Sequence, residues 1–500
     1  MVIRMNRIIT PLFCAAIAGV IGFYLLSFAH IALTVFVLML SLAALCFFRA
    51  AAMSRELLTD NNEQIGRVLM ITSFCCTAFA FGLILGLCAA SAGRNDVRFG
   101  IPENRITGIE GTLLEDPRVL SSGSAMASLS LRYCYGALDN VRVSGSGVIT
   151  IFFPQESAQK LRQFGRGISV FAEGNLRAPG QGFYSGYSFS ASSLHITKQA
   201  SALERLRTGI RLNLIDRFDG KAWGGLALAL LVGIRDNLDA NLTTLYRDAG
   251  LSYILALSGM HLAVITALIA FLLKKPLGLK AASITGAVII CLYCLLAGPM
   301  PSLVRSAIMY LLGVFAILAN VPKKSLSVLC LSFLIQIILT PSAGSSLSFI
   351  LSYLALLGIL ITSRHVSSLL GGIIPDFILQ PLSLSCGAFL ATAGICSFSF
   401  GTIAPIGIIA GLAIVPLTTV FMIGSIFWLV FDLFSFSFIL GYPLSWIYRL
   451  MEIVSSLAGY VPGIRANPYL VLVVSVIMLI SIALLEYRRR SALLKPEPFL

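Results

Sequence analysis

The chain has 500 residues, of which 57% are hydrophobic and only 12% are charged. A soluble domain of this length could not cover itself with so few polar side chains, so the composition excludes one and indicates a membrane protein with many spans. The formal net charge of +14 fits basic cytoplasmic loops and says little by itself about a nucleic-acid partner.

The first 92 residues predict three transmembrane helices. Apolar runs cover residues 8–28, 31–48 and 68–91. A signal peptide would begin in the same way, but the second run follows the first almost directly, which favours a helical hairpin. Arg4 and Arg7 precede the first run and place the N-terminus in the cytoplasm, so three crossings leave the next segment outside.

Residues 93–199 form the only long polar stretch, and apolar and polar residues alternate along it as they do in strands. Five strands are predicted, at residues 106–114, 127–135, 141–153, 168–178 and 187–196. A short helix at 156–163 falls between the third and fourth strands. This order is typical of an OB-like fold, a five-stranded barrel, and another small β-barrel is the alternative. The segment is expected to be an extracytoplasmic domain.

OB folds bind single-stranded nucleic acid through a basic groove and aromatic stacking platforms. Basic and aromatic residues that could make such contacts are Arg132, Tyr133, Tyr135, Arg142, Lys160, Arg162, Arg166 and Arg177, with Phe183, Tyr184 and Tyr187 as a further aromatic group. Residues 94–199 hold eleven Lys and Arg against eight Asp and Glu, a net charge of only +3. A solvated surface with core aromatics, forming a packing or gating collar, is therefore the alternative to a DNA-binding face.

Residues 200–248 predict interfacial and re-entrant helices. Apolar residues recur at helical spacing in 201–219, at Leu203, Leu206, Ile210, Leu214 and Phe218. This spacing predicts an amphipathic helix that lies on the outer surface of the membrane that the chain spans. Residues 223–234 are apolar but too short to cross a bilayer comfortably. They predict a re-entrant segment or one packed beneath the polar domain. Residues 236–248 predict a polar helix.

Residues 249–487 predict a channel-type domain of nine closely spaced spans. The expected spans are 251–273, 281–297, 303–320, 325–340, 347–362, 376–399, 403–431, 436–460 and 468–487. Basic residues gather on the predicted inner side, at Lys274, Lys275, Lys280, Lys323, Lys324, Arg364 and the start of the basic tail 488–500. The positive-inside rule thus gives a cytoplasmic C-terminus. The fold class is a polytopic α-helical membrane protein of about 12 transmembrane helices with an inserted OB-like barrel.

Two of these spans carry polar groups beside a glycine or proline break. Residues 255–261 read LALSGMH and residues 301–309 read PSLVRSAIM. Polar groups at membrane depth are costly and usually face a protein interior or a wet path. The candidate pore residues are Ser258, Gly259, His261, Ser302 and Arg305. The alternatives are a hydrogen-bonded histidine inside a helix bundle and an arginine that extends to the interface or caps a helix.

The residues give little support for an enzyme. Four histidines are spread along the chain without the spacing of metal ligands. Ser258 and His261 share a helix face, but their side chains run parallel and no acidic residue in the span could orient the base. No phosphate-binding Gly-x-x-x-x-Gly-Lys-Ser/Thr loop occurs. We expect no cofactor, no metal and no disulfide framework, since all cysteines but Cys134 lie in apolar runs.

The segments LALSGMH and PSLVRSAIM resemble the two signature segments of the ComEC/Rec-type competence membrane proteins. The resemblance covers roughly residues 101–485. Residues 348–355 resemble a third family segment, with Ile350 where the family usually has Gln. Residues 413–417 resemble a fourth, preceded by Gly411 where an Asn is common. The family's metallo-β-lactamase-like C-terminal domain is expected to be absent, because no His-x-His-x-Asp-His string occurs.

The resemblance implies a channel in the bacterial inner membrane that passes single-stranded DNA into the cytoplasm during natural transformation. It implies no enzymatic activity in this chain, so a separate nuclease, a DNA receptor and a cytoplasmic motor are expected partners beside DNA and membrane lipid. The resemblance is compatible with a monomer and with a homodimer. A transporter of another anionic polymer or lipid precursor is the first alternative, and an intramembrane hydrolase the second.

Overall fold

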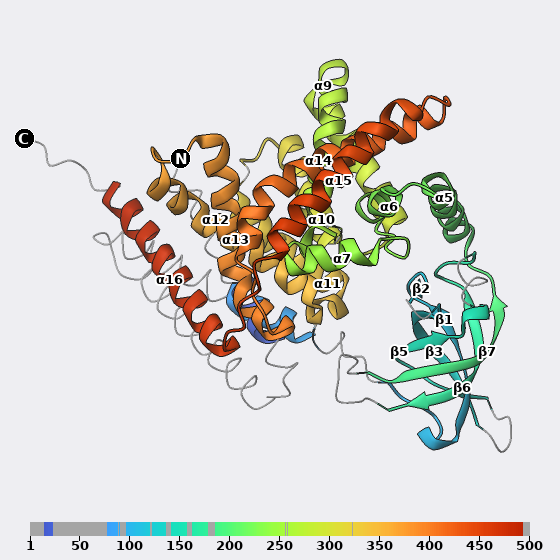
Figure 1. The fold of residues 1–500 in the computed structure, drawn as a ribbon. Coiled ribbons are helices and arrows are strands. Elements are labelled where there is room, and N and C mark those ends of the chain that lie inside the picture. Colours follow the sequence, from blue (N-terminus) through green and yellow to red (C-terminus); the bar gives the residue numbers. More distant parts are fainter. Residues whose placement is uncertain are drawn as a thin grey trace, which may run out of the picture. The chain divides into compact units, whose positions relative to one another are not determined.

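The computed structural model describes residues 15–23, 78–88, 90, 97–120, 123–136, 142–157, 163–178, 186–255, 257, 259–322 and 324–493. The chain divides into two compact units (Figure 1). The barrel unit is Asn95–Leu238, and the helical unit combines Met1–Arg94 with Asp239–Leu500. The three predicted spans before residue 92 lie largely outside the described residues, so the total of 12 spans stays a prediction.

The barrel unit contains a closed five-stranded β-barrel. Five strands close the barrel, and they are called its staves below: β1 (Ile106–Leu113), β3 (Ala125–Gly136), β5 (Val148–Phe153), β6 (Ser169–Arg177) and β7 (Ser188–Lys198). They pair in the circular order β1-β6-β7-β5-β3-β1, and β5 with β7 is the one parallel pair among these described strands. The short strands β2 (Arg118–Val119) and β4 (Arg142–Ser144) pair with β3, and the 3-10 turn η1 (Glu103–Arg105) precedes β1.

Alternation of side chains explains the barrel, because successive residues of a strand face opposite sides. Ile109, Leu129, Ile151 and Phe189 come from four different staves, and all are fully buried in one core. Gly111 lies at a register shift between β1 and β3, where a Cβ atom would collide with the Ser130 carbonyl. Each of the five predicted strands is present, although the third divides into β4 and β5.

Two helices complete the barrel unit. α5 (Ala202–Phe218) begins at Ser201, whose hydroxyl accepts a hydrogen bond from the Glu204 amide, as an N-cap does. α6 (Gly224–Val232) is buried along nearly its whole length. Since Arg211 of α5 donates a hydrogen bond to the Val232 carbonyl at 3.2 Å, the two helices pack together. The apolar segment predicted at 223–234 is therefore packed inside its unit.

The helical unit runs from α7 to α16. Its elements are α7 (Ala240–Asp248), α8 (Ser252–Leu255), α9 (Gly259–Ala297), α10 (Pro301–Leu318), α11 (Ser325–Leu339), η2 (Pro341–Ser345), α12 (Leu347–Leu370), α13 (Asp376–Phe400), α14 (Ile406–Asp432), α15 (Phe438–Gly459) and α16 (Pro468–Leu493). Among the described residues, five of these helices are long and apolar enough to cross a membrane: α9, α10, α12, α13 and α14. The chain is therefore a helical membrane protein.

The predicted spans 251–273 and 281–297 are both present as helices, but the first begins differently from the prediction. The first starts as the short α8 and is interrupted at Leu257 before α9 begins. α9 then consists of two helices that meet at Gly278, and the second ends with the second predicted span. Gly278 has φ 76°, a conformation that glycine adopts readily and other residues rarely do.

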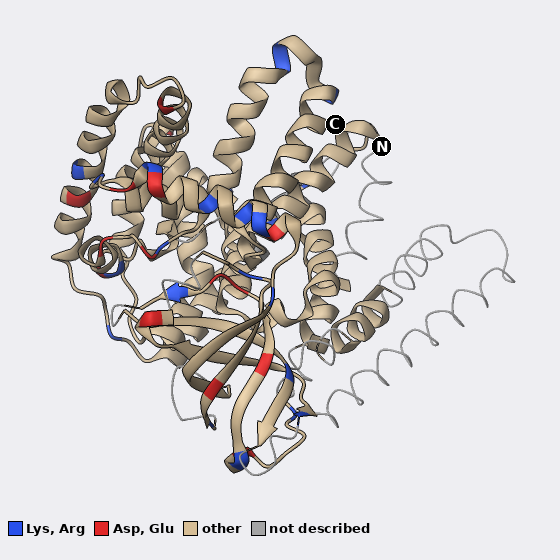
Figure 2. Cartoon of the chain, turned by 90° about the vertical axis from the view of Figure 1, so that its right-hand side faces the viewer, with Lys and Arg blue, Asp and Glu red and all other residues tan. Residues whose placement is uncertain are grey.

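Small residues let the later helices approach closely. A Cβ atom on Gly387 of α13 would collide with the Thr362 hydroxyl and come within 3.1 Å of the Gly358 carbonyl, both on α12. Such small-residue crossings hold membrane helices together by van der Waals contact, since lipid provides no hydrophobic drive. Charge is sparse along these helices (Figure 2), and no aspartate or glutamate occurs between Asp248 and Asp376.

Candidate functional site

The two polar segments found in the sequence meet in the structure. The interruption between α8 and α9 places Gly259 at the first position of α9. A Cβ atom built on Gly259 would lie 2.7 Å from Ser306 Oγ and 3.2 Å from Arg305 Nη2, both on α10. A side chain at this position would require the Ser306 hydroxyl and the Arg305 guanidinium to shift. Ser258 and Ala256 lie outside the described residues.

Arg305 is buried, with 8% of its surface exposed. Its Nη1 donates a hydrogen bond to the Ser352 carbonyl of α12 at 3.0 Å, and the guanidinium lies 5.7 Å from the Tyr353 ring centre. Within the described part of the chain, Arg305 Nε has no hydrogen-bond partner and no carboxylate pairs with the guanidinium. A buried ion usually costs several kcal/mol unless it is paired, so the burial of this guanidinium is only partly offset by its bond to Ser352.

A polar network joins α10, α11 and α12 around that arginine. Ser302 shares a hydrogen bond with Ser352 at 3.1 Å. Gln336 of α11 donates to the Pro301 carbonyl at 2.8 Å and accepts from the Tyr353 hydroxyl at 2.9 Å. Gln336 is fully buried, so its two bonds fix the start of α10 against α12. This residue was missed from the sequence, although a glutamine in the apolar run 325–339 is itself a signal.

His261 lies on another side of α9 from Gly259. It is fully buried, two residues after Gly259, and two positions along an α-helix turn by about 200°. Of the predicted pore residues, the structure brings Gly259, Ser302 and Arg305 together.

The glycine at the start of α9 gives a testable consequence. We expect Gly259→Ala to destabilise the helical unit by about 1–3 kcal/mol, because the added methyl must displace Ser306 and Arg305. The measurement is thermal unfolding of the full-length protein in detergent. Gly441→Ala is the matched control, since no atom lies within 4 Å of a Cβ built on that helical glycine. Equal unfolding temperatures for both variants would contradict the close approach.

The barrel residues predicted to contact DNA differ in exposure and in their partners. Arg132 and Arg177 are exposed, whereas Lys160 and Arg162 lie outside the described residues. The Arg142 guanidinium carbon lies 3.6 Å from the Tyr133 ring centre. Arg142 also forms an ion pair with Glu110 at 3.3 Å, and Tyr135 donates to the same carboxylate at 2.7 Å. The Tyr133 ring on β3 is therefore already covered by the Arg142 guanidinium, and Glu110 binds both Arg142 and the Tyr135 hydroxyl.

Arg166 joins an ion-pair cluster between the barrel and α5. Its Nε lies 2.9 Å from Glu204, and its amide donates to Asp116 at 3.1 Å. Arg207 donates to both oxygens of Asp116, at 2.9 and 2.7 Å, and Arg211 lies 3.5 Å from the same carboxylate. These partners give Arg166 a structural role in holding α5 on the barrel.

Burial disfavours ionisation of the Asp116 carboxyl, but the hydrogen bond from Arg207 and the charges of Arg211 and Arg207 outweigh it. Together with the Arg166 amide, they hold the pKa of Asp116 below its usual value. Asp116 is consequently charged at neutral pH. No group of three or more His, Cys, Asp or Glu residues in the described part of the chain could hold a metal ion.

These features define a helical membrane protein that carries a small closed β-barrel and a buried polar network among its helices. The chain belongs to the Competence protein family, whose pattern matches residues 230–489. The match begins near the end of α6 and covers the whole region from α7 to near the end of α16, including the polar network.

Two proteins are similar to the chain. The chain is 30% identical to "ComE operon protein 3" of Bacillus subtilis (strain 168) over 150 residues, which are 29% of this chain and 19% of the relative. It is 28% identical to an uncharacterised protein of Aquifex aeolicus (strain VF5) over 277 residues, 53% of this chain and 63% of that protein. The chain thus spans less than two thirds of either relative. No solved structure matches it.

Proposed function

We propose that the helical unit passes single-stranded DNA across the bacterial inner membrane into the cytoplasm during natural transformation. Membership of the Competence family supports a role in competence. The observation that carries the proposal is Arg305, a buried guanidinium with an unused Nε donor and no carboxylate partner in the described residues. Arginine matches phosphate geometry and keeps its charge at every physiological pH.

The break between α8 and α9 is the point where the route opens in this proposal. Backbone freed by a broken helix is tolerated in membranes where it borders a cavity or packs on neighbours. Gly259 closes directly on Arg305, so movement of α9 away from α10 would uncover the guanidinium for a passing phosphate. The chain acts as a channel and not as an enzyme. Strand degradation, DNA capture and pulling belong to a nuclease, a receptor and a cytoplasmic motor.

We propose that the barrel is an OB-type domain outside the cytoplasm. Numbering the five staves from one to five in chain order gives the circular arrangement 1-2-3-5-4-1, with the third and fifth strands parallel. An OB fold is a five-stranded Greek-key barrel of this kind. Arg132 and Arg177, both exposed, are its best candidates for touching the phosphate backbone.

Deletion of the gene in a naturally transformable host tests the main proposal. We expect fluorescently labelled DNA to reach the cell surface of the deletion strain but not its cytoplasm, and transformants to disappear. Expression of the wild-type chain from a plasmid should restore both. Unchanged cytoplasmic entry of DNA would contradict the proposal and favour transport of another anionic polymer or a lipid precursor.

A further inference from the structure

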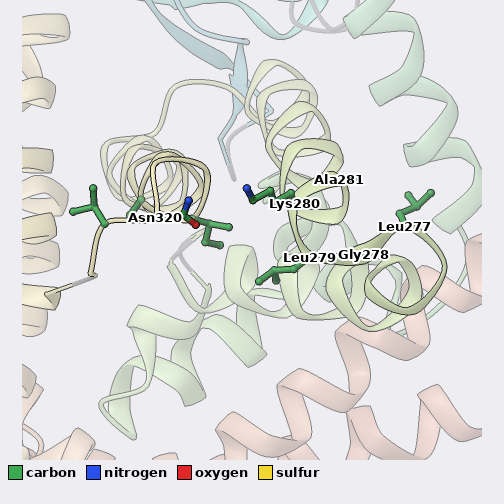
Figure 3. A pocket seen from close by; sticks show the side chains of 9 residues that line it. Leu277, Gly278, Leu279, Lys280, Ala281 and Asn320 are labelled. Carbon is green, nitrogen blue, oxygen red and sulfur yellow. The ribbon is translucent and has the colours of Figure 1, made fainter.

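A hollow of about 710 Å³ lies in the helical unit, away from the Arg305 network. It is formed by the kink of α9 and the C-terminal end of α10 (Figure 3). Nine residues line it: Leu277, Gly278, Leu279, Lys280, Ala281, Ala316, Ile317, Asn320 and Val321. The volume falls within the range of about 300–1,000 Å³ that small-molecule sites occupy.

Two departures from helical geometry produce this hollow. Gly278 has φ 76° and interrupts α9, so a second helical half begins at the wall of the hollow. Asn320 has φ 55° and follows the last turn of α10. Asparagine tolerates this left-handed conformation better than most residues. Figure 3 shows the Lys280 amine directed into the space between α9 and the end of α10, towards Asn320.

The lining combines an apolar wall with two polar groups. Leu277, Leu279 and Val321 are half exposed, at 50%, 53% and 52%. Lys280 and Asn320 supply the polar side chains. This arrangement fits an amphiphile that places a hydrocarbon chain on the aliphatic wall and an acidic group at the amine. A nucleic-acid base would need an aromatic platform, and none of the nine lining residues is aromatic.

Several lysines lie on the elements that form the hollow or directly after them. Lys274, Lys275 and Lys280 lie on α9, and Lys324 immediately precedes α11. In the part of the chain that the structure describes, none of these lysines forms an ion pair, and the sequence has no acidic residue between Asp248 and Asp376. Clusters of lysine beside membrane helices attract anionic lipid headgroups on the cytoplasmic side, where the sequence predicts these residues to lie.

We propose that this hollow binds an anionic phospholipid, whose phosphate is held by Lys280 and Asn320 and whose acyl chain lies on the aliphatic wall. The proposal is independent of DNA transport, because it uses no residue of the Arg305 network. A bound lipid would join the two halves of α9 to α10 next to the kink.

Native mass spectrometry of the full-length protein in detergent, titrated with phosphatidylglycerol or phosphatidylcholine, tests this site. We expect the wild type to retain phosphatidylglycerol in preference to phosphatidylcholine. Lys280→Gln should weaken phosphatidylglycerol binding about fivefold, the loss that follows from removing one charge near an anionic headgroup. Arg465→Gln, which removes an exposed charge elsewhere in the helical unit, should leave binding unchanged.

A second variant tests the apolar wall. Ala316→Trp should fill the hollow and lower phosphatidylglycerol retention while every lysine remains. The proposal is overturned if both Lys280→Gln and Ala316→Trp bind phosphatidylglycerol like the wild type, or if the wild type retains phosphatidylcholine equally well. It is also overturned if Lys280→Gln reduces binding of an oligothymidine and leaves lipid binding intact, which would assign the lysines to DNA.

Discussion

DNA entry into the cytoplasm is expected to fall about 10- to 100-fold in the Arg305→Gln variant, while the protein reaches the membrane in normal amounts. The physical reason is the loss of charge-assisted hydrogen bonds from the guanidinium to phosphate, each worth about 1.5–3 kcal/mol. Quantitative uptake of labelled DNA, normalised to the protein in the membrane fraction, measures the effect. Arg364→Gln is the matched control, because Arg364 is an exposed arginine on α12.

Stability separates transport from a purely structural role of Arg305. The buried Arg305 guanidinium has no carboxylate partner among the described residues, so the cost of its desolvation is poorly offset, and Arg305→Gln should unfold at or above the wild-type temperature. Arg305→Lys should restore part of the uptake, since an ammonium supplies charge without the planar fork. If uptake falls only in proportion to lost folded protein, Arg305 serves packing and the proposed route is wrong.

Much of the fold follows from patterns within short windows of the sequence. Apolar alternation located the staves β1, β3, β6 and β7 within about two residues, because a strand has only two faces. The long apolar runs likewise located α10 to α16. Pro276 and Gly278 beside two lysines indicate a break between two spans, and the structure has two helices that meet at Gly278 without a longer loop.

The site was only partly accessible from the sequence. Arg305 and Gly259 stand out because charge and a helix break are costly inside a bilayer. Their mutual approach depends on how α9 crosses α10, which no local pattern encodes. The same limit explains Arg166, which resembles a phosphate contact in a basic segment. Its partner Glu204 is 38 residues further along the chain, beyond the reach of periodicity.

The second large effect is expected on the stability of the barrel unit. Asp116→Asn should destabilise this unit by about 3 kcal/mol, because Arg207 loses the carboxylate that binds it through both oxygens. The Arg207 side chain is only 6% exposed, so water cannot replace that partner. Glu204 lies 3.7 Å from Arg207 and offsets only a part of this loss. Hydrogen exchange of β1 and β6 in the full-length protein measures the local stability. Glu115→Gln is the control, since Glu115 pairs on the surface with Arg118 and such pairs contribute at most about 1 kcal/mol.

Acidic pH should remove the difference in stability between the wild type and the Asp116→Asn variant. The pKa of Asp116 is lower in the folded protein than in the unfolded chain, so its contribution to stability is fully present above the unfolded value. As the pH falls through the lowered pKa, the folded carboxylate takes up a proton and that contribution is lost. The wild type should therefore lose stability below about pH 4, towards the level of the variant. If the difference in stability between the wild type and the variant stayed constant down to the lowest pH at which the protein folds, the Asp116 charge would not hold α5 on the barrel.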